Sequence, residues 1–130
     1  MLADIRIWLG LAALNGLMGV AAGAFGAHAI QQAQAKEWLR TGAQYQLIHA
    51  VAALACYGLL RLATGPASLA GWLFGVGGLV FAGSLYLMAV TGVRVLGAVT
   101  PIGGLALIAG WAVLLWGIFV SVAVASPPAS

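Results

Sequence analysis

Charged residues are scarce in this chain of 130 residues, and their scarcity argues against most classes of soluble protein. Asp, Glu, Lys and Arg make up 5% of the sequence, whereas hydrophobic residues make up 64%. Soluble domains typically contain about 25% charged and about 45 to 50% apolar residues. The net charge of +3 comes from five basic and two acidic residues without any basic run. A soluble globule, a disordered chain and a nucleic-acid-binding protein are therefore not expected.

Residue types that carry catalysis and metal binding are equally few. The single cysteine, Cys56, has no disulfide partner within the chain, and His28 and His49 lack nearby Cys, Asp or Glu to complete a zinc site. The only carboxylates, Asp4 and Glu37, flank the apolar segments, and no catalytic or phosphate-binding motif is present. We therefore expect a protein that is not an enzyme and that holds no metal or cofactor.

Long apolar segments dominate what is present. A helix needs about 20 mostly apolar residues to cross about 30 Å of hydrocarbon. The sequence predicts spanning helices at residues 7–27, 44–62, 69–91 and 100–124, preceded in the second case by a polar interfacial segment at 30–42. Gly65-Pro66 predicts a tight turn between the second and third helices. The expected fold is all-α, a polytopic integral membrane four-helix bundle formed as a single domain over residues 1–130.

The first apolar segment has a second interpretation as a cleaved signal peptide, because small residues follow it. Its apolar stretch continues for about 20 residues. Only Arg6 supplies a positive charge before it. We therefore expect a retained helix in a bacterial inner (plasma) membrane protein.

Polar residues collect on one side of the predicted bundle. The end of the first helix, the start of the second, the end of the third and the start of the fourth lie on one side of the membrane, here called the B side. Lys36, Arg40 and Arg94 lie on the B side, against Arg6 and Arg61 on the other. Since cytoplasmic loops carry an excess of Lys and Arg, the B side is predicted to face the cytoplasm, with both termini outside.

The B-side polar residues predict a pocket for a small molecule, a lipid headgroup or a proton. The candidate lining residues are His28, Tyr45, His49, Tyr86, Arg94 and Thr100. Tyr45 and His49 are four residues apart and share a helix face. An ionisable side chain at this depth normally faces inward and has a partner. In this hypothesis His49 exchanges a proton, Tyr45 orients it, and Arg94 contacts an anionic group.

The same residues fit other roles. The alternative for His49 is a neutral histidine that joins a tyrosine and a backbone carbonyl and so holds adjacent helices. Asn15 is expected to bond across helices and Ser84 to its own helix. The protein is then a structural or assembly subunit that packs against other membrane proteins, or, as a third class, a small oligomeric transporter. Expected partners are membrane lipids and either a second copy, through glycine-rich helix faces, or another membrane protein, whereas nucleic acid is not expected.

Four ordered motifs carry a resemblance to a known family. They are Gly23-Ala24-Phe25-Gly26-Ala27-His28, Tyr45-Gln46-Leu47-Ile48-His49-Ala50, Phe81-Ala82-Gly83-Ser84-Leu85-Tyr86, and Thr100-Pro101-Ile102-Gly103-Gly104 with Gly110-Trp111. With these motifs the chain resembles the YgdD-like family of small bacterial inner-membrane proteins, also called domain-of-unknown-function family 423, which has a mitochondrial transmembrane-protein-256 branch. Many relatives have Ser where this chain has Ala82, so any role of that serine hydroxyl in the family is not expected in this chain. The resemblance implies a membrane protein of about four helices without an agreed activity.

Overall fold

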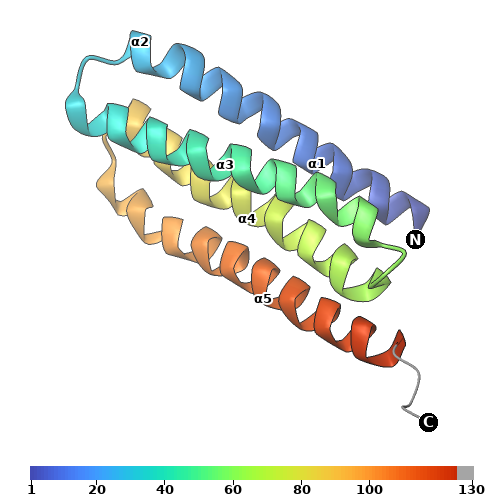
Figure 1. Cartoon of the computed structure of the whole chain (residues 1–130). Coiled ribbons are helices and arrows are strands. Elements are labelled where there is room, and N and C mark those ends of the chain that lie inside the picture. The colour runs from blue at the N-terminus through green and yellow to red at the C-terminus, as the bar shows by residue number, and fades with distance from the viewer. Residues whose placement is uncertain (126–130) are drawn as a thin grey trace.

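The computed structural model describes residues 1–125, and helices account for nearly all of them (Figure 1). In chain order the elements are α1 (Leu2–Ala21), the π-helical turn η1 (Ala22–Gly26), α2 (Ala27–Ala29), α3 (Ala33–Leu59), α4 (Thr64–Thr91), the 3-10 turn η2 (Arg94–Ala98) and α5 (Thr100–Ala125). Four of them are long and run up and down side by side, so the expected all-α bundle is confirmed. Residues 126–130 of the expected domain lie outside the described part.

The bundle is an open one, with α4 as its central helix. α4 packs along both α3 and α5, and α1 packs on α3 and α4. α5 makes its main contacts with α4 and η2, which leaves its other faces uncovered (Figure 1). Consequently a groove between α3 and α5 opens to the outside of the bundle.

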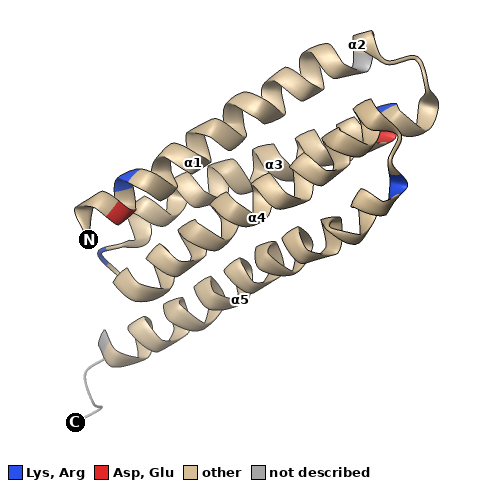
Figure 2. Cartoon of the chain, turned by 180° about the vertical axis from the view of Figure 1, so that it is seen from behind, with Lys and Arg blue, Asp and Glu red and all other residues tan. Residues whose placement is uncertain are grey.

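Three helical stretches are long and apolar enough to cross a membrane: Leu2–Gly26, Thr64–Thr91 and Arg94–Val124. In the described residues, charged residues lie only toward the two ends of the bundle, and its middle carries none (Figure 2). α3 has a more polar first half, yet it runs beside α1 and α4 and returns the chain to the end where α4 begins (Figure 1). This arrangement is that of an integral membrane protein, because charges at the hydrocarbon level are costly.

The connections differ from those predicted. α4 begins at Thr64, so Gly65-Pro66 lies in its first turn rather than in a turn between helices. Proline is tolerated there because the first N–H groups of a helix have no intrahelical acceptor. The chain reverses at residues 60–63 instead, where the Ala63 amide donates to the Leu59 carbonyl at 2.9 Å.

The polar stretch at 30–42, predicted as an interfacial segment, is not separate from the second long helix. From Ala33 onward it forms the first turns of α3, which continues without a break to Leu59. Ala, Gln, Lys, Glu, Leu and Arg predominate here, and all are good helix formers. Their propensity extends the second long helix toward the B side.

Small residues let α4 approach α1 and α5 closely. A Cβ atom added at Gly71 would lie 2.7 Å from the Trp8 ring of α1. One added at Gly110 of α5 would lie 2.5 Å from the Phe74 ring of α4. Trp8 and Phe74 are the largest fully buried side chains of the core. These glycines therefore serve packing within the chain, because only a missing side chain admits an aromatic ring at such distances.

Candidate functional site

His49 is buried within the bundle and both of its ring nitrogens are hydrogen-bonded. Nδ1 lies 2.7 Å from the Tyr45 carbonyl oxygen, and Trp111 Nε1–H donates to Nε2 at 3.1 Å. A carbonyl can only accept and an indole N–H can only donate, so Nδ1 carries the proton and Nε2 the lone pair. The arrangement fits a neutral imidazole that joins α3 to α5. The predicted carbonyl partner is present, whereas the second partner is a tryptophan instead of a tyrosine.

Aromatic rings surround the histidine. The Tyr45 ring stacks on the imidazole with centroids 6.0 Å apart and lies 4.7 Å from the Phe81 ring. Phe74 and Trp111 contact the imidazole from α4 and α5. Tyr45 and His49 thus lie together, as their spacing of four residues predicted.

These rings line a groove between α3 and α5 with a volume of about 460 Å³. Its lining residues are Tyr45, His49, Phe81, Gly104, Leu107, Ile108 and Trp111. The side chains of Tyr45 and Trp111 are 45% and 48% exposed, so the groove opens sideways, toward the position of the lipid. A second, almost wholly apolar hollow of about 460 Å³ shares Trp111 and continues along Ala52, Leu59 and Leu115.

Tyr86, another predicted pocket residue, belongs to a different polar cluster. Its hydroxyl donates to Gln46 Oε1 at 2.8 Å, and Gln46 Nε2 donates to Asn15 Oδ1 at 3.0 Å. Asn15 Nδ2 donates to the carbonyls of Gly75 and Leu11 at 2.9 and 2.8 Å. The network thus crosses from α4 to α3, α1 and back to α4, and confirms that Asn15 bonds across helices.

Thr100 is paired with Ser84 at the junction of α4 and α5. The two hydroxyl oxygens lie 2.6 Å apart, and Ser84 Oγ also donates to the Phe81 carbonyl at 2.8 Å, as predicted for a buried serine. Such pairs satisfy polar groups within the protein, where few water molecules are available.

Arg94 and His28 lie at the B-side end of the bundle. Arg94 begins η2 and His28 lies in α2, and both side chains are exposed. Neither residue lines the groove beside His49. The six predicted residues therefore lie in several places: two in the groove, one in the amide network, one in the hydroxyl pair and two at the surface.

The predicted set leaves out three residues that matter in the structure: Asn15, Gln46 and Trp111. The first two are buried amides in apolar helices, and that rarity is a signal, since polar groups at membrane depth require partners. Trp111 carries no such signal, because one tryptophan among five does not reveal which helix it faces.

Metal chemistry finds little support in the described residues. Over residues 1–125, no group of three or more His, Cys, Asp or Glu side chains is arranged to hold a metal ion. The groove beside His49 contains no carboxylate, thiol or serine hydroxyl that His49 could activate. What the groove offers is apolar surface and neutral hydrogen-bonding groups.

Comparison with known proteins gives relatives that are membrane proteins. The model of the family described as Protein of unknown function (DUF423) matches residues 22–104. UPF0382 membrane protein YwdK of Bacillus subtilis is 37% identical over 85% of this chain and 94% of its own length. A UPF0382 membrane protein of Haemophilus influenzae is 40% identical over 88% of this chain and 94% of its own length. UPF0382 inner membrane protein YgdD of Escherichia coli is 37% identical over 86% of this chain and 88% of its own length. No solved structure matches.

Proposed function

Because this chain belongs to the DUF423 family of bacterial inner-membrane proteins, whose activity is unknown, we propose its function from the groove between α3 and α5. The proposed function is to bind an amphipathic, lipid-soluble molecule that enters from the bilayer. Such a molecule has an uncharged hydrogen-bonding head and an apolar ring or chain.

The observation that carries the proposal is the composition of the groove wall at the level of His49. Tyr45, His49 and Trp111 bring a hydroxyl, an imidazole and an indole to one side-opening groove. Ligand pockets typically combine apolar and aromatic walls with a few placed polar groups. No charged side chain lines this groove, which favours an uncharged head over an ionic one.

The length of the groove favours a molecule with an extended apolar part. Below Trp111 the second hollow continues between Ala52, Leu59 and Leu115, with scarcely any polar surface. A chain lying there would contact both α3 and α5. Tyr45, partly exposed, lies one turn nearer the B side than His49, and the head of such a molecule would lie beside it.

The role proposed is binding and not catalysis. His49 is held by Tyr45 O and Trp111 Nε1, and a ligand head can replace Trp111 as the hydrogen-bond donor to Nε2 without any covalent bond being made or broken. Proton exchange at His49 would require loss of the Trp111 contact, because a protonated Nε2 cannot accept from an N–H group.

The proposal is tested by photolabelling the full chain in nanodiscs with a diazirine-bearing long-chain alcohol. We expect saturable labels on Trp111 and Leu115, displaced by unlabelled long-chain alcohol. Gly104→Leu should abolish them, because a Cβ at Gly104 lies 3.7 Å from the Phe81 ring, an ordinary contact distance, and the rest of the leucine fills the groove. The matched control is Gly10→Leu, where nothing lies within 4 Å. Labelling that does not saturate contradicts the proposal, and so does labelling of exposed Leu17 of α1 to the same extent as Trp111 and Leu115.

A second candidate function is that of an assembly subunit. The observation that favours it is the one-sided packing of α5, which leaves Trp111, Leu115 and Trp116 exposed along its outer face. A helix of another membrane protein, or of a second copy, would cover this face. Single-molecule photobleaching of the chain in nanodiscs tests the second copy: one bleaching step per disc contradicts self-association.

A further inference from the structure

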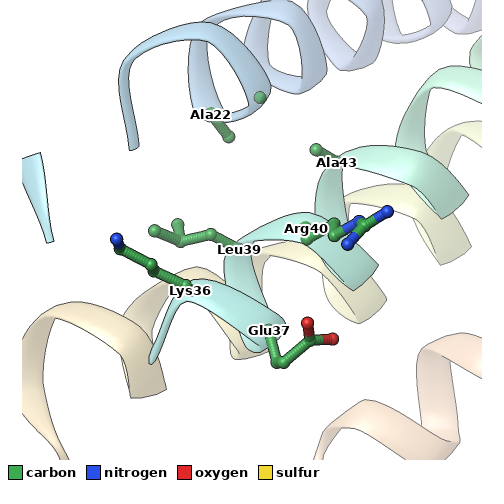
Figure 3. Close-up of a pocket in the computed structure, with 7 residues that line it drawn as sticks. Ala22, Lys36, Glu37, Leu39, Arg40 and Ala43 are labelled. Carbon is green, nitrogen blue, oxygen red and sulfur yellow. The ribbon is translucent and has the colours of Figure 1, made fainter. Parts of the chain in front are cut away.

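A third cavity, distinct from the groove and from the apolar hollow that continues it, lies on the opposite side of α3 from both. It has a volume of about 420 Å³ and is enclosed by the π-helical turn η1 and the first turns of α3 (Figure 3). Lys36 and Arg40 are four residues apart on α3 and both line it, as does Glu37 between them. At 3.6 residues per turn, this face of α3 points away from Tyr45 and His49. The two sites are therefore independent of each other.

The pocket exists because small residues meet where α1 ends. Ala22 and Gly23 face Ala43 across it, and a Cβ at Gly23 would lie 3.8 Å from the Ala43 Cβ. Leu39 forms part of the floor. The π-helical turn adds a residue to the last turn of α1, and such turns occur frequently at functional sites.

Two positive charges border the pocket without an internal partner. The only ion pair within the described residues joins the N-terminal amine to Asp4, at the other end of the bundle. Figure 3 shows Lys36 and Arg40 extending toward opposite ends of the pocket, whereas Glu37 is directed away from the Ala22 side. Two cations and one carboxylate, that of Glu37, line the pocket. Its lining therefore keeps an excess of positive charge, and no ion pair joins Glu37 to Lys36 or Arg40 in the described residues.

The pocket lies at the B-side end of the bundle, the end at which we place a headgroup layer. In the described residues, charged residues lie only toward the ends of the bundle, and those of α3 lie toward the B side (Figure 2). Along α3, Leu39 lies between Lys36 and Arg40, and Ala43 lies one turn farther from the B side; both are buried. Lys and Arg reach from helix ends toward lipid phosphates.

We propose that this pocket is a binding site for a phosphate group, supplied by the headgroup of an anionic phospholipid. Arg40 donates two hydrogen bonds from its planar guanidinium to phosphate oxygens, and Lys36 contributes a compact charge from the other end of the pocket. The lipid source is favoured over a free phosphate compound because the pocket lies at the charged end of a membrane-embedded bundle, where basic pockets between helices bind lipid headgroups.

The test is native mass spectrometry of the full chain, counting tightly bound phosphatidylglycerol against phosphatidylcholine with the same acyl chains. We expect one phosphatidylglycerol per chain that phosphatidylcholine does not replace. Lys36→Gln and Arg40→Gln should each weaken its retention about fivefold, the contribution of one cation at a membrane surface. Arg94→Gln is the matched control, a cation at the same end of the bundle outside the pocket, and should leave retention unchanged.

A cavity-filling variant separates a built pocket from general attraction of anionic lipid. Ala22→Leu keeps both cations but occupies the pocket, and we expect it to abolish the one-to-one complex. The proposal is overturned if Ala22→Leu has no effect on phosphatidylglycerol retention. It is also overturned if Arg94→Gln weakens retention as much as Lys36→Gln and Arg40→Gln, or if the chain retains phosphatidylcholine as well as phosphatidylglycerol. Circular dichroism of each variant confirms that it is folded. If Arg40→Gln unfolds, phosphatidylglycerol retention is measured with Arg40→Lys instead, which keeps the charge but loses the paired hydrogen bonds and should also weaken retention.

Inorganic phosphate distinguishes the two sources of the phosphate. Added to the chain in phosphatidylcholine nanodiscs, it should neither bind measurably nor displace phosphatidylglycerol if the lipid is the ligand. Displacement by inorganic phosphate at equal affinity overturns the lipid assignment and leaves a soluble phosphate compound as the occupant of the same pocket.

Discussion

At the scale of single residues, the buried amide of Gln46 links three helices. It accepts from the Tyr86 hydroxyl and donates to Asn15; Gln46 and Asn15 are fully buried, and Tyr86 is partly buried. Interhelical hydrogen bonds in membranes contribute about 0.6 kcal/mol on average and up to about 1.7 kcal/mol. Replacing Gln46 therefore removes two such bonds at once.

We expect Gln46→Leu to lower the free energy of unfolding by about 1 to 3 kcal/mol, the sum of two interhelical bonds. The measurement is unfolding in mixed detergent micelles, followed by circular dichroism. Gln44→Leu is the matched control, because Gln44 lies two positions earlier in α3 with an exposed side chain. Equal losses for the two variants would show that the network has no stabilising role.

His49 offers a second prediction at this scale, concerning its tautomer. Trp111 Nε1–H can only donate and the Tyr45 carbonyl can only accept, so the proton must lie on Nδ1. Solid-state ¹⁵N NMR of the imidazole should show a protonated Nδ1 and an unprotonated Nε2. Trp111→Phe frees Nε2 and should change its ¹⁵N shift while Nδ1 remains bonded. A proton on Nε2 in the wild-type chain would contradict the bond to Trp111.

Sequence reasoning reached the pair Tyr45 and His49 but not the partners across helices. A spacing of four residues within one helix depends only on local geometry, and it placed the two rings together. Whether Tyr86 faces His49 or Gln46 depends on the rotation of α4 against α3, which no local pattern fixes. The predicted pocket therefore separated into a groove, an amide network and a hydroxyl pair.

At the scale of helices, α4 owes its central place to glycine. Gly71 faces Trp8 of α1, while Gly110 of α5 faces Phe74 of α4. The sequence predicted that glycine-rich helix faces could contact a second copy. The structure places these glycines in intramolecular contacts, since each aromatic ring occupies the space left by a missing side chain.

Gly110→Ala tests this packing. Its Cβ would lie 2.5 Å from a Phe74 ring carbon, which a buried ring cannot tolerate without movement of α5 against α4. Overpacking of this kind typically costs about 1 to 3 kcal/mol. We expect a loss of that size in the unfolding assay. Gly10→Ala, with nothing within 4 Å, should be neutral or stabilise by up to about 1 kcal/mol, since alanine favours the helix.

At the scale of the whole molecule, composition and segment length sufficed for the fold class, because a bilayer admits few alternatives to bundled helices. The ends of the helices were less predictable. Gly65-Pro66 is tolerated inside the first turn of α4, and the polar residues after Ala33 prolong α3. Helix ends depend on capping and on where the membrane surface lies, and hydropathy alone does not report either.

The orientation of the bundle is the remaining property of the whole molecule that its charges predict. Three cations lie at the B side, namely Lys36 and Arg40 near the start of α3 and Arg94 in η2, and two lie at the other side, namely Arg6 in α1 and Arg61 before α4. Figure 2 shows Lys and Arg at both ends of the bundle. The excess of cations predicts a cytoplasmic B side. In a Cys56→Ser background, a membrane-impermeant maleimide added to intact cells should label Ala3→Cys, which is exposed near the N-terminus.

The companion variant is Gln32→Cys, exposed at the start of α3 on the B side, which should react only after the cells are opened. The unsubstituted chain serves as the control, because Cys56 is buried and should not react in either case. The opposite labelling pattern would place Lys36 and Arg40 outside. The phosphate pocket would then face the outer leaflet, and phosphatidylglycerol offered to that leaflet alone would suffice to fill it.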